Sequence, residues 1–336
     1  MIADSINAQV IVIGAGISGV IAAITMADAG IDVLVLDKGR SVGGRLATRR
    51  IRDGVADHGA QFFTVREPEF QQFVDQWIAN DLVFVWSHGW SDGSLLKTAA
   101  DGHPRYAVRG GLNTLPRTLA QQLKRVQVNV QIATATRDEA GWILQDQDGN
   151  IFTCDYLLMT PPVPQSLALL EQGATDLAVE ERAALERITY APCLAGMFVI
   201  TGEVTLPSPG AIQRKNSNVH WIADNRAKGI SDGATILTVQ ANERYSKQMW
   251  EAPDEHVLSA LRTNLQLFLA PGARIVEEQL KRWRYSAVQI THPDRYLATK
   301  ETPYAVFAGD AFGGPRVEGA FLSGLAAGRA LVDMVR

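Results

Sequence analysis

The stretch AQVIVIGAGISG, residues 8–19, decides the fold of this chain. Residues 8–13 form an almost continuous β-branched run, which suits a parallel strand buried on both faces of a sheet. A glycine-rich turn of the pattern GxGxxG follows directly, and residues 20–29 are rich in alanine and aliphatic side chains at helical spacing. The order of strand, glycine turn and helix predicts a unit that binds a dinucleotide.

Each glycine has its own steric role in such a turn. Gly14 permits the tight turn, Gly16 lets the main chain approach a pyrophosphate without a Cβ in the way, and Gly19 lets the helix pack closely on the strand. The N–H groups at Ile17 and Ser18 open the helix, where the positive end of the dipole stabilises an anion. These five residues are therefore predicted to hold the phosphates.

A second strand, DVLVL at residues 32–36, ends at Asp37. This acid lies 18 residues beyond Gly19, where a carboxylate can accept hydrogen bonds from both ribose hydroxyls. It would repel a 2′-phosphate, which disfavours NADP as the tightly held nucleotide. The alternative interpretation is that Asp37 only caps the loop after its strand.

The loop continues as KGRSVGGR, residues 38–45, with a second glycine pair and several cations. It resembles the segment that follows the dinucleotide fingerprint in flavoproteins of the amine oxidase, phytoene desaturase and renalase superfamily. The resemblance implies that Lys38, Gly44 and Arg45 pass beside the pyrophosphate and flavin of FAD. A mobile, solvated glycine turn is the alternative.

Two further segments in the first third of the chain resemble the same superfamily. Residues 57–63, DHGAQFF, resemble its segment beside the isoalloxazine, which implies cofactor contacts for Gln61 and Phe62. Residues 109–112, RGGL, resemble its second glycine approach to the cofactor. Val130, in a later apolar run, is also expected to contact FAD.

The strongest resemblance lies near the end of the sequence. The strand-like run AVFA leads into Gly309 and Asp310, and RVEGAFLSG follows at residues 316–324. The resemblance implies that Asp310 holds the ribityl or pyrophosphate region. It also implies that Gly319 and Ala320 start a helix whose N–H groups face the pyrimidine end of the flavin, where an N-terminus stabilises negative charge by about 0.3 to 2 kcal/mol.

The two ends of the predicted cofactor site lie far apart in the sequence, since Gly14 and Gly309 are separated by 295 residues. A chance occurrence of both motifs is improbable, so the first 60 and last 40 residues are expected to form one site. Arg316 and Glu318 are either part of it or an exposed loop pair.

The fold class expected is α/β, with a Rossmann-like FAD-binding domain split along the sequence and a second α+β substrate domain, as in amine oxidases and p-hydroxybenzoate hydroxylase. The FAD-binding domain is expected at residues 1–60, 105–162 and 295–336. The substrate domain then takes residues 61–104 and 163–294. Neither of its segments contains another dinucleotide fingerprint, which argues against a separate NAD domain.

Periodicity predicts the remaining elements. The FAD-binding domain is expected to contain strands at 124–132, 155–160 and 305–308, and a hairpin of 142–144 with 151–153. The substrate domain is expected to contain strands at 193–201, 219–223 and 236–241, and helices at 178–187 and 255–269.

Substrate contacts are predicted less directly, in a pocket between the two domains. Most of the aromatic side chains, which are Trp77, Trp86, Trp90, Trp221 and Trp250, fit an ordinary core. Trp283 and Tyr285 are favoured as pocket walls, because the segment KRWRY is expected to re-enter the FAD-binding domain. Phe62 and His220 are further candidates, and His58, Arg66 and His292 are weaker ones; no catalytic residue is assigned.

Composition excludes several classes of function. The 336 residues carry a formal net charge of −4 and a pI near 5.9, without the basic footprint that nucleic-acid binding requires. No apolar run reaches the roughly 18 to 20 residues that cross a bilayer, and no secretory signal is recognisable. We expect a soluble, cytoplasmic protein without an integral membrane segment. Cys154 and Cys193 fit buried thiols and match no metal spacing.

The short chain, the RWRY segment and the RVEGAFLSG ending resemble bacterial renalases more than larger amine oxidases. This resemblance implies an oxidase that returns abnormal dihydro isomers of NAD(P) to the oxidised nicotinamide and passes the electrons to oxygen or another acceptor. No cysteine lies near Gly309, so FAD is expected to be noncovalent. A flavin amine oxidase, a carotenoid-type desaturase and a noncatalytic binding protein of the same fold are the alternatives.

Overall fold

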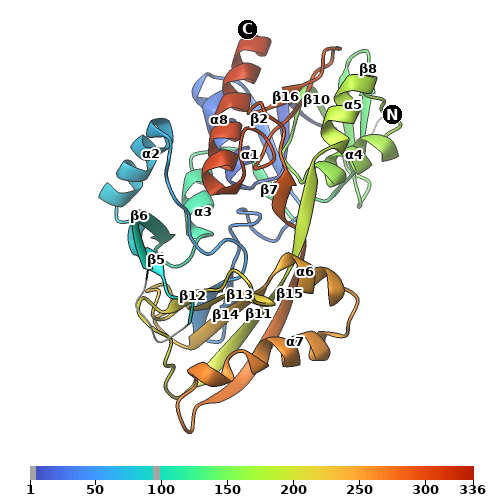
Figure 1. Ribbon diagram of the computed structural model, residues 1–336. Helices are drawn as coiled ribbons and strands as arrows, with labels where there is room; N and C mark the ends of the chain where they lie inside the picture. The colour runs from blue at the N-terminus through green and yellow to red at the C-terminus, as the bar shows by residue number, and fades with distance from the viewer. Residues whose placement is uncertain (1–4, 94–98) are drawn as a thin grey trace. The chain divides into compact units, whose positions relative to one another are not determined.

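The computed structural model describes residues 5–93 and 99–336, and the chain divides into two compact units (Figure 1). Unit 1 consists of Met1–Gly44, Pro116–Thr189 and Val288–Arg336, and unit 2 consists of Arg45–Leu115 and Tyr190–Ala287. Each unit is therefore assembled from segments that lie far apart in the sequence.

Unit 1 is built on an eight-stranded sheet whose main path runs β16-β17-β10-β1-β2-β7, with β9 pairing β10 and β8 off this path. β1 is parallel to both β10 and β2, and its apolar side chains are buried, as expected for a central strand. The strands are β1 (Ile6–Ile13), β2 (Val33–Asp37), β7 (Val126–Val128), β8 (Ile132–Asp138), β9 (Gly141–Asp146), β10 (Ile151–Met159), β16 (Leu297–Ala298) and β17 (Ala305–Phe307).

Two glycine-bearing helices of unit 1, α1 (Ile17–Asp28) and α8 (Arg316–Val335), pack closely together (Figure 1). A Cβ at Gly324 would lie 2.2 Å from the Ser18 carbonyl oxygen, and one at Gly328 would lie 2.9 Å from that of Ala22. The missing side chains therefore let the helix backbones approach each other. The other helices are α4 (Val163–Gln172), α5 (Val179–Glu186) and α3 (Thr114–Ala120), which begins in unit 2.

Unit 2 contains a five-stranded sheet of order β12-β13-β14-β11-β15 and two hairpins, β3–β4 and β5–β6. One apolar cluster joins strand residues such as Phe198 and Val239 to Val257 and Leu261 of α7. The elements are β3 (Thr48–Ile51), β4 (Gly54–Asp57), α2 (Pro68–Ala79), β5 (Val83–Trp90), β6 (Ala99–Val108), β11 (Thr189–Thr201), β12 (Ala211–Gln213), β13 (Val219–Asp224), β14 (Thr235–Ala241), α6 (Glu243–Gln248), α7 (Asp254–Thr263), η1 (Gln266–Phe268) and β15 (Arg274–Ile290).

A second apolar cluster fixes hairpin β3–β4 on this sheet. Ile51 and Ala56 of the hairpin pack against Met197, Val199 and Ile236 of β11 and β14. The contact determines where the residues just beyond the hairpin lie, including the segment that follows Asp57.

The prediction of a single strand at 124–132 is wrong. β7 ends at Val128, and β8 begins at Ile132 and pairs with β9 instead. Asn129 between them has a φ of 58°, a left-handed conformation that asparagine tolerates better than most residues. Alternating apolar residues look the same in one strand and in two short ones, so the break carries little signal.

Three other elements differ in extent from their predictions. The expected hairpin arm at 151–153 and strand at 155–160 are one continuous strand, β10. The expected helix at 255–269 ends at Thr263 and is followed by the separate turn η1. The helix predicted at 178–187 is present as α5, but it belongs to unit 1.

The compact units divide the chain at points other than the predicted domain boundaries. Residues 45–60 lie in unit 2, because hairpin β3–β4 packs on the five-stranded sheet. Residues 163–189 lie in unit 1, where α4 contacts β8. Trp283 lies within β15 of unit 2, and the chain returns to unit 1 only at Val288. The expected return at KRWRY is therefore wrong.

None of the helices in the described ranges combines the length and the apolar character that crossing a bilayer would need.

Candidate functional site

In unit 1, strands β1, β2, β10 and β17 run in parallel, so their carboxyl ends lie at one edge of the sheet. In register, Ile13 of β1 lies beside both Leu36 of β2 and Met159 of β10. The edge gathers three of the predicted cofactor residues: Gly14, Asp37 and Gly309. Ligands of open parallel sheets bind in a crevice at such an edge.

The three fingerprint glycines meet different surroundings. Gly14 has a φ of +101°, and a Cβ there would lie 2.4 Å from Thr160 Oγ1. A Cβ at Gly19 would lie 2.0 Å from the Gly14 carbonyl oxygen, so helix and turn are in close contact. At Gly16 a Cβ would meet no described atom within 4 Å. The φ of Gly16, −71°, also suits any residue.

The surroundings of Gly16 show whether this turn has room and hydrogen-bond donors for the pyrophosphate of a dinucleotide. The protein itself does not need a glycine there, so the free volume is available to a bound group. The adjoining helix α1 has no side-chain cap and no acid in its first turn. Ser18 Oγ is buried without a hydrogen-bond partner among the described residues. Bare N–H groups, an unpaired hydroxyl and free space fit a pyrophosphate.

Asp37 holds the loop around this space together. Its Oδ2 accepts a hydrogen bond from the Ala15 N–H at 2.6 Å, and its Oδ1 accepts one from the Gly39 N–H at 2.6 Å. The capping role that the sequence left open is therefore present. A carboxylate offers about four lone-pair positions, so Asp37 retains capacity for ribose hydroxyls, and that second role stays a prediction.

The glycine-rich loop after Asp37 folds back onto the fingerprint. The Gly43 N–H donates to the Ala15 carbonyl oxygen at 2.7 Å, and a Cβ at Gly44 would lie 3.4 Å from Gly16 Cα. The prediction that Gly44 lies near the phosphate-binding turn agrees with this placement. Val130 is also close, because its N–H donates to the Asp37 carbonyl oxygen at 2.9 Å.

Lys38 points to another part of unit 1. Its Nζ donates to Gln165 Oε1 of α4 at 3.2 Å. The hydrogen bond engages the ammonium group outside the turn, so its predicted cofactor contact stays a prediction.

The carboxyl end of β17 is built around Ser323. The Gly309 N–H donates to Ser323 Oγ at 2.8 Å, and Ser323 Oγ donates to the Arg295 carbonyl oxygen at 2.6 Å. Gly309 has a φ of +137°, which only glycine adopts without strain. Half-buried Asp310 follows it at the same edge.

Helix α8 starts earlier than its resemblance implied. It begins at Arg316, so Gly319 and Ala320 lie inside its first turns and do not start it. A Cβ at Gly319 would lie 1.9 Å from the Gly314 carbonyl oxygen, which explains a glycine there by close packing of the preceding loop. Arg316 and Glu318 lie in the first turn of α8 and not in a loop, and Arg316 is exposed. Their part in the cofactor site stays a prediction.

In unit 2, the segment 57–61 is held by side chains of the five-stranded sheet and its loops. Two N–H groups of the segment donate hydrogen bonds: that of Asp57 to Asn225 Oδ1, and that of His58 to the Ala47 carbonyl oxygen. Four of its carbonyl oxygens accept side-chain hydrogen bonds: Asp57 from Thr238 Oγ1 (2.8 Å), His58 from Trp283 Nε1 (2.8 Å), Gly59 from Gln240 Nε2 (2.7 Å) and Gln61 from Lys228 Nζ (2.5 Å).

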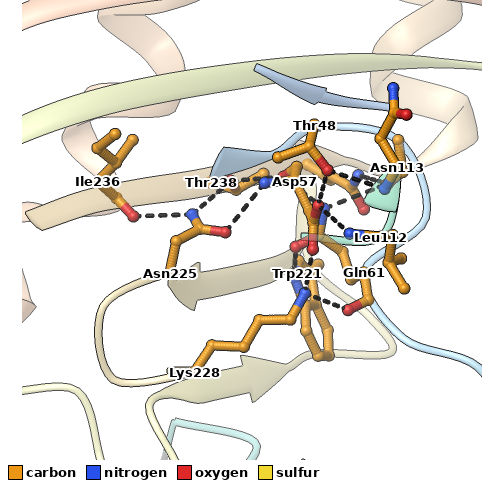
Figure 2. Close-up of polar contacts among 12 residues, drawn as sticks. Thr48, Asp57, Gln61, Leu112, Asn113, Trp221, Asn225, Lys228, Ile236 and Thr238 are labelled. Atoms are coloured by element: carbon orange, nitrogen blue, oxygen red, sulfur yellow. Dashed lines mark hydrogen bonds and ion pairs between the residues drawn. The ribbon is translucent and has the colours of Figure 1, made fainter. Parts of the chain in front are cut away.

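Asp57 and Lys228 form an ion pair at the centre of this network (Figure 2). Lys228 Nζ lies 2.5 Å from Asp57 Oδ2, and both side chains are fully buried. Asp57 Oδ1 accepts from the Thr48 hydroxyl at 2.5 Å and from the Leu112 N–H at 2.9 Å. Both oxygens of this carboxylate thus accept hydrogen bonds from protein donors.

The glycine pair at 110–111 serves this network. Gly111 has a φ of +102°, and a Cβ there would lie 2.5 Å from Thr48 Oγ1 and 2.9 Å from Asp57 Oδ1. A glycine is needed for the chain to pass the buried carboxylate. The similarity of RGGL to a cofactor approach therefore has a local structural explanation in unit 2.

Burial lowers the pKa of Lys228, while the charge of Asp57 and its hydrogen bond oppose that change. The ammonium group also lies 4.8 Å from the centroid of the Trp86 ring, where a cation is attracted by the negative face of the indole. The environment thus compensates the charge from two sides.

Four aromatic side chains belong to one cluster in unit 2: Phe62, Trp86, Trp90 and Trp221. The Trp86–Trp90 and Trp90–Trp221 centroids are 4.6 and 4.9 Å apart, in edge-to-face geometry. Trp221 Nε1 donates to Gln61 Oε1 at 3.1 Å. The rings fill one another's space, which agrees with the prediction that most of these tryptophans are core residues.

His58 and Trp283 stack in unit 2, with centroids 5.5 Å apart and planes at 20°. Burial, followed by the charges of Arg49 and Lys281, lowers the pKa of His58 to about 3. The ring is therefore neutral at physiological pH, and its Nδ1 has no hydrogen-bond partner among the described residues.

Tyr285 and Arg45 also belong to unit 2. Arg45 donates to the Tyr285 carbonyl oxygen at 3.4 Å and lies over the Tyr190 ring. Tyr190 and Tyr285 meet edge to face at 5.6 Å. The flavin contacts predicted for Arg45, Gln61 and Phe62 stay predictions.

The remaining candidates are dispersed. His220 lies in β13, and burial lowers its pKa. Arg66 is exposed before α2. His292 lies in unit 1, where its Nδ1 accepts from the Asp294 N–H at 3.1 Å. None of these three joins the Asp57 network.

Sequence reasoning missed the groups that hold segment 57–61, above all Lys228 and Asn225. Asp57 and Lys228 are 171 residues apart, and Lys228 lies in the polar sequence DNRAKG, which is typical of a solvated turn. The only local signal is a change from β-strand to turn residues at Asp224. A buried partner could not be inferred from it.

Two family models match this chain. One, described as flavin containing amine oxidoreductase, matches residues 83–332, and one described as NAD(P)-binding Rossmann-like domain matches residues 12–77. The fold of unit 1 and the match over the N-terminal segment agree.

Individual relatives give the same picture. The chain is 23% identical to Renalase of Mus musculus over 333 residues, which cover 94% of this chain and 96% of the relative. It is 24% identical to Digeranylgeranylglycerophospholipid reductase 1 of Methanosphaera stadtmanae over 176 residues, or 52% of this chain and 40% of that protein. A solved putrescine oxidase, bound to putrescine, superimposes with a TM-score of 0.75 at 15% identity, covering 98% of this chain and 100% of that one. The last similarity concerns the fold alone.

Proposed function

This chain belongs to the family of flavin-containing amine oxidoreductases, and from that premise we propose that it is an FAD-dependent oxidase of a dihydropyridine substrate, such as an isomeric dihydro-NAD(P). Its family makes it a flavin-dependent oxidoreductase. The observation that carries the finer proposal is the similarity to Renalase over nearly the full length of both chains. The resemblance of the sequence motifs to bacterial renalases supports the same substrate.

We propose that unit 1 holds the ADP part of FAD without a covalent bond. The free space at Gly16, the uncapped start of α1 and the Ser18 hydroxyl suit the pyrophosphate, and Asp37 suits the ribose. Cys154 and Cys193 are buried, and burial raises the pKa of each thiol to about 12. Such thiols are poor nucleophiles for attaching a flavin.

Bound flavin supplies a two-electron acceptor: the hydride of the dihydropyridine leaves as the ring becomes a pyridinium, and this hydride with one solvent proton converts O2 into hydrogen peroxide. Aromatisation of the substrate drives the loss of hydride, so the protein needs to provide orientation more than acid–base catalysis. Segment 57–61 suits an orienting role, because side chains hold its carbonyl groups in place.

An anaerobic absorbance titration of the purified, FAD-loaded protein tests this proposal. We expect one equivalent of 6-dihydro-NAD per flavin to bleach the flavin band. Admitting air should then restore the band, with one hydrogen peroxide formed for each substrate molecule oxidised. NADH is the matched control, because it has the same composition and charge but carries its hydride at another ring position, and it should bleach the flavin far more slowly.

Two outcomes would replace the proposal. Bleaching by putrescine or another amine, without bleaching by 6-dihydro-NAD, would make the protein an amine oxidase. A protein that retains no flavin after purification and reconstitution would contradict the assignment of unit 1 to FAD.

A further inference from the structure

Two cationic side chains of unit 2, those of Arg49 and Lys281, lie at the edge strand of its sheet. β15 is the edge strand of the five-stranded sheet, and because side chains alternate along a strand, Gln279, Lys281 and Trp283 share one face. Arg49 of β3 reaches this face, where its NH1 donates to Gln279 Oε1 at 3.0 Å. Lys281 Nζ lies 4.8 Å from the centroid of the Trp283 ring. All four side chains are partly exposed.

The Glu277 carboxylate contacts this group through Gln279 and is also paired with Arg52. Glu277 Oε2 accepts from Arg52 Nε at 2.8 Å, and Glu277 Oε1 accepts from Gln279 Nε2 at 3.0 Å. The hydrogen bond from Arg52, and then that from Gln279, lower the pKa of Glu277, so it is charged and paired. Gln279 offers its neutral carbonyl oxygen to Arg49. Arg49 therefore has an amide, and no carboxylate, as its partner among the described residues.

His58 adds a buried polar group to the same place. It is 5% exposed and stacks on Trp283, and its Nδ1 is buried without a hydrogen-bond partner in the part of the chain that the structure describes. Arg49 and Lys281 are close enough to act on its charge. The positive charges of Arg49 and Lys281 thus both act on this neutral ring.

We infer that Arg49, Lys281 and His58 form an anion-binding subsite that takes a phosphate group of a nucleotide substrate. Arginine presents paired N–H donors that match phosphate geometry, and lysine adds a point charge. An ammonium group would be repelled by both cations at this site. The identification of the nucleotide as the reducing substrate rests on the proposed function, whereas binding of the anion does not.

Isothermal titration of the FAD-loaded protein tests the subsite, with sodium pyrophosphate and with NAD+ as nonreducing probes. Arg49→Gln and Lys281→Gln should each raise the Kd of both probes by about tenfold or more, since each variant removes a positively charged hydrogen-bond donor. Arg49→Lys should retain much of the affinity, because the charge is kept. Arg50→Gln is the matched control: its side chain is the next one along β3 and points to the opposite, exposed face, so its Kd should stay within about twofold of wild type.

Each outcome has one meaning. An equal Kd in Arg49→Gln and Arg50→Gln, together with an unchanged Kd in Lys281→Gln, would overturn the subsite even if 6-dihydro-NAD still bleached the flavin. Pyrophosphate binding that depends on Arg49 and Lys281 would uphold it even if no dihydropyridine reduced the protein, and the proposed substrate alone would then be wrong. Should Arg49→Gln fail to fold, Arg49→Lys and Lys281→Gln decide the matter.

Discussion

At the scale of single residues, the buried pair of Asp57 and Lys228 dominates the electrostatics of unit 2. Removing two charges from water costs several kcal/mol for each ion, and a salt bridge offsets this only when further hydrogen bonds satisfy both groups. Here Thr48 and Leu112 donate to the carboxylate, and Gln61 accepts from the ammonium group. The pair is therefore stable only as a complete set.

Replacing Lys228 with Met should lower the free energy of unfolding by about 3–5 kcal/mol, because the Asp57 charge would be left buried and unpaired. Urea unfolding followed by tryptophan fluorescence measures this change. The double variant Asp57→Asn/Lys228→Met should recover part of the loss, since neither charge remains.

Lys247→Met is the matched control for this prediction. Lys247 forms an exposed ion pair with Glu243 at the i,i+4 spacing, and its removal should cost less than about 0.5 kcal/mol. Equal losses in Lys228→Met and Lys247→Met would show that the buried pair is not an important contact.

The neutral state of His58 predicts a pH dependence of stability. The pKa of His58 is about 3 in the folded protein and near 6.5 in an unfolded chain, so only the unfolded chain gains a proton between these values. The stabilising contribution is complete above pH 6.5 and is lost as the pH falls toward 3. From pH 7 to pH 5 the loss amounts to about 2 kcal/mol.

Urea unfolding of wild type and of His58→Gln at pH 7 and pH 5 measures this effect. The variant should lose about 2 kcal/mol less on acidification than wild type. Its residual pH dependence includes His220, whose pKa burial also lowers. The same acid sensitivity in both proteins would mean that His58 is protonated, or solvated, in the native state.

The candidate residues of unit 1 and of unit 2 differ in how far they could be predicted from the sequence. Gly14, Gly16, Gly19 and Asp37 are recognisable because they form a local pattern of glycines and an acid at fixed spacing between a strand, a helix and a second strand. The side chains that hold segment 57–61 could not be predicted, because Lys228 and its partners come from distant strands and loops and carry no local pattern. Local chemistry is written in the sequence, whereas contacts between strands become visible only in the fold.

At the scale of elements, the contact of α1 with α8 depends on the glycines of α8. Gly324 faces the Ser18 carbonyl oxygen so closely that a Cβ would lie 2.2 Å from it, whereas a Cβ at Gly16 would meet nothing. One glycine is thus required by packing and the other by whatever occupies the free space. The two positions separate stability from cofactor binding.

Gly324→Ala should lower the free energy of unfolding by about 1–3 kcal/mol, because the helices must move apart. Gly16→Ala should change the stability of the flavin-free protein by less than about 1 kcal/mol, yet weaken FAD retention by more than tenfold. Urea unfolding and the ratio of flavin to protein absorbance after gel filtration measure the two effects. Full flavin retention in Gly16→Ala would assign the free space to some other role.

Element predictions succeeded where the pattern was long and failed where a turn interrupted it. The strand before the fingerprint and the helix after it are present as β1 and α1. The break at Asn129 was missed because three residues in a turn leave the alternation of apolar side chains intact. The helix expected at 255–269 was too long, since apolar spacing continues through η1 after the helical hydrogen bonds have ended.

At the scale of the whole molecule, the predicted class is confirmed: a Rossmann-like domain split along the sequence, with a second α+β domain, in the amine oxidase superfamily. Motifs near both ends of the sequence identified the class, because a cofactor-binding fold requires specific residues wherever the chain passes the cofactor. The division into units was not readable in the same way. Residues 45–60 look like a continuation of the nucleotide fold, and only their packing on the five-stranded sheet places them in unit 2.

The division of the chain among the units also sets an order of events during translation. Unit 2 has all of its residues once Ala287 has been synthesised. Unit 1 contains the first strand, β1, yet β17 and α8, which border β10 and α1, are made after residue 300. During synthesis, β1 and α1 are therefore present long before β17 and α8. The apolar face of α1 stays uncovered until α8 has been made. Unit 1 therefore completes its fold only after synthesis has reached α8, the helix that packs on α1.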